Sequence, residues 1–135
     1  LNAGNLAGTM AWSGDILYNA IWAGHPYEFI VPEGGSLLWI DNMLIPAHSA
    51  NPAGALELMD FYYDPVNAAT LAAWVNYICP VDGAKQAMEK IDPSIVDNEL
   101  IFPTEKTLSQ THRFMALDEA QMRTYEGDFA DVTGA

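Results

Sequence analysis

Two short segments of this chain, AWSGD and LWIDN, each place a tryptophan close to an aspartate. The first holds Trp12 and Asp15, and the second holds Trp39 and Asp41. The face of an indole ring attracts cations, and a carboxylate accepts charge-assisted hydrogen bonds from an ammonium group. Two such pairs within 30 residues of a very acidic chain predict a site for a small organic amine cation.

The second pair lies in an apolar run that reads FIVPEGGSLLWIDNMLIP, residues 29–46. Side chains alternate along a strand, so we expect Trp39 and Asp41 to point to the same face. An aspartate inside an apolar strand is costly unless it is paired, exposed or used. A cation–π contact of about 0.5–2 kcal/mol and a charge-assisted hydrogen bond of about 1.5–3 kcal/mol favour use as an ammonium site. The alternative is that Asp41 and Asn42 form a turn that ends the strand.

The first pair, Trp12 and Asp15, lies where a predicted strand passes into a predicted helix. Ligand sites in open α/β sheets collect at the carboxyl ends of strands, which favours a binding role for both residues. The alternative is that Trp12 belongs to the core and Asp15 caps the helix. Tyr77 stands at the end of a third predicted helix and precedes a break at Pro80. It could line a pocket, or it could be a half-buried core aromatic.

The elements that position these residues change in character near residue 50. We predict strands over residues 7–12, 27–31, 36–41 and 42–45, with a helix from Asp15 that closes at Gly24 and a turn at 32–35. The order strand, helix, strand in the first 31 residues is typical of a parallel α/β sheet.

The rest of the chain carries repeated helix start signals, an asparagine or aspartate followed by proline. We predict six helical segments here. The first begins at Asn51-Pro52 and ends near Tyr63, and the second follows Asp64-Pro65 over 66–77. The third is capped by Asp82 and runs to Met88, the fourth is one turn at Asp92-Pro93, the fifth begins at Pro103-Thr104, and the last covers 117–130. Gly127 weakens the last of these.

Composition excludes several classes of partner. The net charge is −13 and only five residues are Lys or Arg, so the chain cannot neutralise nucleic-acid phosphates or bind an anionic membrane surface. Acidic charge instead steers cationic ligands towards the protein, and it also keeps exported proteins soluble. The single cysteine, Cys79, allows no disulfide within the chain. No apolar run approaches the 18 residues or so of a membrane span.

The sequence offers no enzyme machinery and no cofactor site. The three histidines are far apart, metal-ligand spacing is absent, and no serine has a nucleophile frame. One alternative is a hydrolase or transferase that uses Asp15 and Asp41 as an acid/base pair, which would need a raised carboxyl pKa and a nucleophile. Another keeps the fold and binds an anion or a sugar, but an anion site favours Arg, Lys or helix amides over aspartate.

The quoted segments, together with residues 53–75 and Ile101-Phe102-Pro103, resemble the polyamine-binding solute-binding proteins of bacterial ABC importers, the spermidine/putrescine type. The resemblance is strongest over residues 29–46 and weakens after about Thr107. It implies that Trp12 and Trp39 flank a methylene chain, that Asp15 and Asp41 bind ammonium groups, and that Tyr77 contacts the edge of the ligand.

The resemblance also implies a two-lobed periplasmic-binding-protein fold of type II, of which this chain is the C-terminal portion. Residues from 1 to about 45 would supply second-lobe strands and the hinge, and residues from about 46 to 135 a mostly helical segment that returns over the lobes. The implied partners are a polyamine, an ABC permease in the inner membrane and a missing N-terminal lobe. The implied location is the periplasm, or the cell exterior as a membrane-anchored lipoprotein.

A chain that starts at Leu1 in the apparent middle of a domain leads us to expect a fragment. We expect such a fragment to expose sheet edges and apolar faces. We therefore expect it to bind amines weakly or not at all, since closure needs both lobes, and to self-associate.

Overall fold

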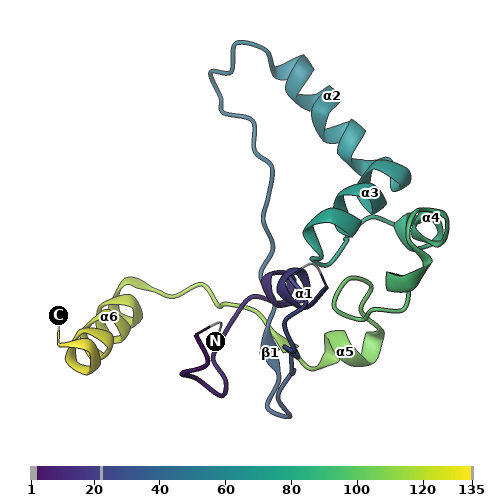
Figure 1. Cartoon of the computed structure of the whole chain (residues 1–135). Coiled ribbons are helices and arrows are strands. Elements are labelled where there is room, and N and C mark those ends of the chain that lie inside the picture. The colour runs from purple at the N-terminus through teal and green to yellow at the C-terminus, as the bar shows by residue number, and fades with distance from the viewer. Residues whose placement is uncertain (1–2, 22, 135) are drawn as a thin grey trace.

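The computed structural model describes residues 3–21 and 23–134, and helices dominate it (Figure 1). In chain order the elements are α1 Ser13–Ile21, β1 Ser36–Leu37, α2 Pro52–Tyr63, α3 Pro65–Val75, α4 Ala84–Ile91, the 3-10 helix η1 Pro93–Ile95, α5 Glu105–Ser109, β2 Thr111–His112 and α6 Glu119–Thr133. The predicted first helix is therefore confirmed but ends at Ile21, before Gly24, and Trp22 lies outside the described residues.

The Asn/Asp-Pro start signals are confirmed. The Asn51 side chain accepts a hydrogen bond from the Gly54 N–H at the start of α2, and Asp64 caps α3 in the same way. Proline at the first helical position costs nothing because its missing N–H would have no partner there. Asp92 caps η1, and Asp118 forms a reciprocal capping box with Gln121 at the start of α6.

The predicted cap at Asp82 is wrong. The N-cap of α4 is Gly83, which has a φ of 83° and makes no side-chain cap hydrogen bond, so Asp82 lies one residue outside the capping position. The backbone of Gly83 adopts the left-handed region, which residues other than glycine rarely adopt. The helix consequently starts at Ala84 and continues past Met88 to Ile91.

The core lies between α3, α4 and the segment around η1. Its buried apolar residues are Ala68, Ala69, Ala72, Ala84, Met88, Ile95 and Ile101. Alanines on the facing side of α3 let the backbone of α4 approach closely, and Met88 fills the space that remains. Leu17 of α1 packs against this cluster, which ties the first helix to the later ones.

In the described part of the chain the sheet consists of one parallel pair, in which Ser36 faces Thr111 and Leu37 faces His112. A ring nitrogen of His112 lies 3.2 Å from the Gly34 carbonyl oxygen. Gly35 has a φ of 90°, and a Cβ there would lie 2.4 Å from the Gln110 carbonyl oxygen. The turn before β1 therefore needs glycine for both its backbone angle and its close approach to β2.

The predicted strands over 7–12, 27–31 and 42–45 are not formed, and the one over 36–41 is reduced to β1. A strand is stable only when a neighbour accepts and donates its backbone hydrogen bonds. In the described residues no second strand lies beside these segments. In the described residues, the parallel α/β sheet expected from the strand pattern is thus replaced by a helix-rich structure with two short strands.

The molecule is open. Its accessible surface is 10543 Å², whereas a folded monomer of this mass exposes about 7,000 Å². Figure 1 shows why: α2 and the segment before it extend away from α1, and α6 lies at the end of a long linker on the other side. Large apolar side chains such as Phe61, Trp74, Phe114 and Phe129 are exposed. No helix in the described ranges combines the length and apolarity that crossing a membrane requires.

Candidate functional site

Trp12 and Asp15 lie on either side of the start of α1. The Trp12 carbonyl accepts a hydrogen bond from the Ile16 N–H at 3.2 Å, so Trp12 is the residue immediately before the helix and Asp15 lies in its first turn. The Trp12 side chain is 55% exposed. The alternative in which Trp12 belongs to the core is therefore not what the structure has.

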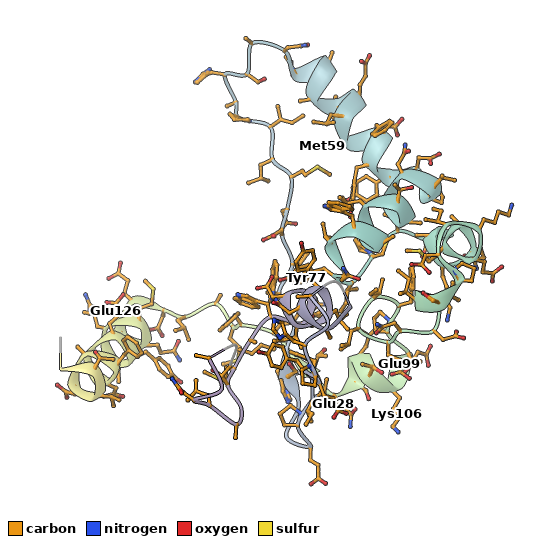
Figure 2. All side chains as sticks on the ribbon, in the orientation of Figure 1. Glu28, Met59, Tyr77, Glu99, Lys106 and Glu126 are labelled. Atoms are coloured by element: carbon orange, nitrogen blue, oxygen red, sulfur yellow. The ribbon has the colours of Figure 1, made fainter. Side chains whose placement is uncertain are left out.

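Tyr77 is placed by the end of α3. The preceding Asn76 is 1% exposed and adopts the left-handed conformation, with a φ of 57°, as the C-cap of the helix. Its N–H donates to the Ala72 carbonyl at 2.9 Å, and its side-chain amide donates to the Trp74 carbonyl at 3.2 Å. This cap ends the helix two residues earlier than predicted and turns the chain, so that Tyr77 lies beside α1 (Figure 2).

Three aromatic rings form a row across this junction. The ring centroids of Trp12 and Trp39 are 5.3 Å apart at an interplanar angle of 72°, and those of Trp39 and Tyr77 are 5.9 Å apart at 68°. Both pairs are edge-to-face, the geometry that aromatic quadrupoles favour. Trp39 is the centre of the row and contacts a ring on each side.

The row borders an open pocket of about 370 Å³ that is lined by Trp12, Trp39, Asp41 and Tyr77. The expectation that Trp39 and Asp41 share a face agrees with this lining, in which the intervening Ile40 has no part. The alternation persists although this segment has no ladder partner in the described residues, because an extended backbone alone sets it.

Asp15 joins this group through Tyr77 and is not itself a lining residue. The Tyr77 hydroxyl lies close enough to Asp15 for the carboxylate to affect its ionisation. Burial raises the pKa of Tyr77 above its ordinary value, and the negative charge and hydrogen bond of Asp15 raise it further, against a smaller opposite effect of a backbone hydrogen bond. The hydroxyl is therefore protonated, and is a donor, at neutral pH.

The pocket carries negative charge and no cationic side chain. The two ion pairs found among residues 3–21 and 23–134 join Lys85 to Asp97 and Arg123 to Glu119, and none of these four residues lines the pocket. Within the same ranges, no group of three His, Cys, Asp or Glu side chains could hold a metal ion. Asp41 beside two indole faces can thus accept hydrogen bonds from an ammonium group while the rings contact the attached methylenes.

Sequence reasoning missed two residues that shape the pocket. Gly14 is buried in the first turn of α1, where a Cβ would lie 2.4–2.7 Å from three ring atoms of Tyr77. The glycine of AWSGD carries no signal for this contact, because its partner is 63 positions away in sequence. Asn76 could have been found: an asparagine directly after an apolar helical run is a known left-handed C-cap.

The family described as bacterial extracellular solute-binding protein matches residues 1–103. Over 101 residues the chain is 31% identical to the spermidine/putrescine-binding periplasmic protein of Salmonella typhimurium, an alignment that covers 75% of this chain and 28% of that protein. It is 30% identical over 128 residues to the putrescine/cadaverine-binding protein of Pseudomonas aeruginosa, covering 91% and 35% of the two chains.

A third relative is the norspermidine sensor of Vibrio cholerae, 32% identical over 77 residues, which cover 56% of this chain and 21% of the sensor. No solved structure matches the chain. The aligned part of the chain spans 28% of the length of the Salmonella protein and 35% of the length of the Pseudomonas protein. A family of binding proteins does not favour the alternative in which Asp15 and Asp41 form the acid/base pair of a hydrolase or transferase.

Proposed function

The chain belongs to the bacterial extracellular solute-binding protein family. From that premise we propose that it serves as the substrate-binding component of an ABC importer and captures a polyamine such as putrescine or spermidine. The observation that carries the proposal is the pocket in which Asp41 lies beside the indoles of Trp12 and Trp39. The three relatives are all named for polyamines or diamines, which supports the same ligand class.

In the proposed complex an ammonium group meets the Asp41 carboxylate and the methylene chain lies along Trp12 and Trp39. Tyr77 contacts the edge of the ligand, and Asp15 completes the site beside Tyr77. An aliphatic chain gains by leaving water for an aromatic surface, at about 25 cal/mol per Å² of apolar area buried. The absence of Arg and Lys from the pocket lining favours an amine over an anionic cargo.

We propose that the complete protein has the two-lobed type II fold. Residues from 1 to about 45 would contribute second-lobe strands and the hinge, and residues from about 46 to 135 the mostly helical segment that returns over the lobes. An N-terminal lobe would close over the ligand, and the closed form would dock on a permease in the inner membrane. The proposed location is the periplasm, in line with the name of the Salmonella relative. The alternative is a lipoprotein that is anchored to the membrane at the cell exterior.

We expect the isolated chain to bind putrescine with a dissociation constant near the millimolar range. One cation–π contact and one charge-assisted hydrogen bond contribute about 2–5 kcal/mol together, and about 4 kcal/mol corresponds to 1 mM. Tryptophan fluorescence at micromolar protein would follow the titration, with NaCl at matched ionic strength and glucose as controls. A response to NaCl equal to that for putrescine would overturn the proposed function, and sub-micromolar affinity would contradict the expected weakness.

Trp39→Ala tests the role of the aromatic row in the same titration. It removes the ring that contacts both neighbours, so we expect at least a tenfold loss of putrescine affinity, the equivalent of about 1.4 kcal/mol. Ile40→Ala is the matched control, because Ile40 is adjacent and exposed but does not line the pocket. Equal losses from the two substitutions would argue against a ligand along the indoles.

We also propose that the isolated chain self-associates through its uncovered apolar surface. Phe61, Leu71 and Trp74 border an open apolar groove of about 390 Å³ on α2 and α3, and exposed patches of this kind promote association. Light scattering across a concentration series is expected to show a mass that rises with concentration. A constant monomer mass at high concentration would refute this expectation.

A further inference from the structure

Two adjacent residues in the first turn of α1, Gly14 and Asp15, lie beside Tyr77. At Gly14, an added Cβ would approach the Cε2, Cδ2 and Cζ atoms of Tyr77 to 2.4, 2.5 and 2.7 Å. Real Cβ atoms essentially never come within 3.0 Å of another heavy atom, so either the ring or the helix would have to move. At the next residue, the Asp15 carboxylate lies close enough to the Tyr77 hydroxyl to raise its pKa.

The ring would disturb its other contacts if it moved away from a side chain at position 14. It is stacked edge-to-face with Trp39 at 5.9 Å, and its backbone follows directly on the buried cap Asn76. A ring in van der Waals contact on one face and in an aromatic contact on another is fixed more firmly than an exposed tyrosine. Tyr77 is therefore one wall of the pocket because α1 leaves a gap for it.

We propose that Gly14 and Asp15 are positioning residues: Gly14 seats the Tyr77 ring, Asp15 holds its hydroxyl, and Asp41 is left as the carboxylate that meets the ammonium group. The two aspartates of the site thus have different tasks, although the sequence presents them as equivalent partners of a tryptophan. The part that concerns ammonium binding rests on the proposed function, whereas the seating of Tyr77 does not.

A double-mutant cycle tests the seat without any ligand. We expect Gly14→Ala to lower the melting temperature of the chain by about 5 °C or more. In a Tyr77→Ala background the clash is gone, and alanine is the better helix former, so the same substitution should leave the melting temperature unchanged or raise it. An equal loss of melting temperature in both backgrounds would refute the proposal that Gly14 makes room for the Tyr77 ring.

Gly127→Ala is the matched control for this cycle. Gly127 lies inside α6 with no atom within 4 Å of its Cβ position, so its substitution should have the same small effect whether residue 77 is tyrosine or alanine. If Gly14→Ala prevents folding altogether in the wild-type background but not in the Tyr77→Ala background, the seat is supported as well.

The hydroxyl contact has its own readout, the absorbance of tyrosinate at 295 nm. The charged groups that face Tyr77 are Asp15 from α1 and Asp41 from the segment after β1. Subtracting the curve of Tyr77→Phe isolates Tyr77, which should titrate above the ordinary value of 10.0. Asp15→Asn should bring the pKa back towards that value, Asp15→Glu should largely keep it raised, and Asp41→Asn should move it less than Asp15→Asn does. An unchanged titration in Asp15→Asn would refute the assignment.

A comparison of putrescine with butylamine separates positioning from ligand contact. A positioning role predicts that Asp15→Asn weakens the binding of both amines by the same factor, because the second ammonium of putrescine does not meet Asp15. Selective weakening of putrescine would instead make Asp15 a ligand for that second ammonium and overturn the division of tasks. If neither amine binds the wild-type chain, the proposed function and the ammonium role of Asp41 fail, while the melting and absorbance experiments still decide the seat.

Discussion

Asp41→Asn should weaken putrescine binding about 10- to 100-fold, the equivalent of about 1.5–3 kcal/mol for a charge-assisted hydrogen bond. The substitution keeps the size of the side chain and its place in the pocket, but it removes the charge that an ammonium group needs. Trp12 and Trp39 remain, so an amine that bound mainly through its methylenes would lose little. The loss should appear as a shift of the fluorescence titration to higher putrescine concentration at constant ionic strength.

The control for this prediction must remove the same charge elsewhere, because a net charge of −13 attracts any cation. Glu126→Gln does so on α6, which Figure 2 shows well away from Tyr77 and α1. We expect this variant to bind putrescine as the wild type does at moderate salt, where exposed charges are screened beyond about 10 Å. Equal losses from Asp41→Asn and Glu126→Gln would mean that the amine follows the overall charge and not the pocket.

Met88→Ala should lower the free energy of unfolding by about 2–5 kcal/mol. Met88 is 0% exposed and fills the space between α3 and α4 in the only buried apolar cluster of the described residues. Truncation leaves a cavity that the short alanines of α3 cannot fill. Urea denaturation followed by helix circular dichroism measures the change.

Met115→Ala is its matched control, since Met115 is 78% exposed in the linker before α6. We expect it to change the free energy of unfolding by no more than about 0.5 kcal/mol. Similar costs for both methionines would contradict the assignment of the core to α3 and α4. Because Asn76 and Tyr77 follow directly on α3, Met88→Ala should also weaken amine binding in proportion to the unfolded fraction.

The helices could be predicted because their signals are local. Asn51-Pro52 and Asp64-Pro65 supply both the capping oxygen and the proline within two residues, and nothing distant is needed to read them. Asp82 shows the limit: the residue type was right for a cap, but Gly83 with its positive φ moved the start of α4. Boundaries depend on such backbone choices, which side-chain preferences do not report.

The strands could not be predicted in the same way, because a strand depends on its neighbour. Residues 7–12 and 27–31 have strand composition, yet without a ladder partner in the described residues they do not form strands. The pairing that does form, β1 with β2, joins Ser36 to Thr111, and no pattern in either segment indicates the other. The site follows the same division: the shared face of Trp39 and Asp41 was readable, whereas the contact of Gly14 with Tyr77 was not.

The parallel pair has an entropic consequence. Ser36 and Thr111 are 75 positions apart, so their contact closes a loop that contains α2, α3, α4, η1 and α5. Closing a flexible loop of that length costs about 4 kcal/mol beyond a constant, more than two short strands alone return in water. The packing of α3 against α4 fixes part of the chain between these ends, so the helices lower the cost of pairing the two strands.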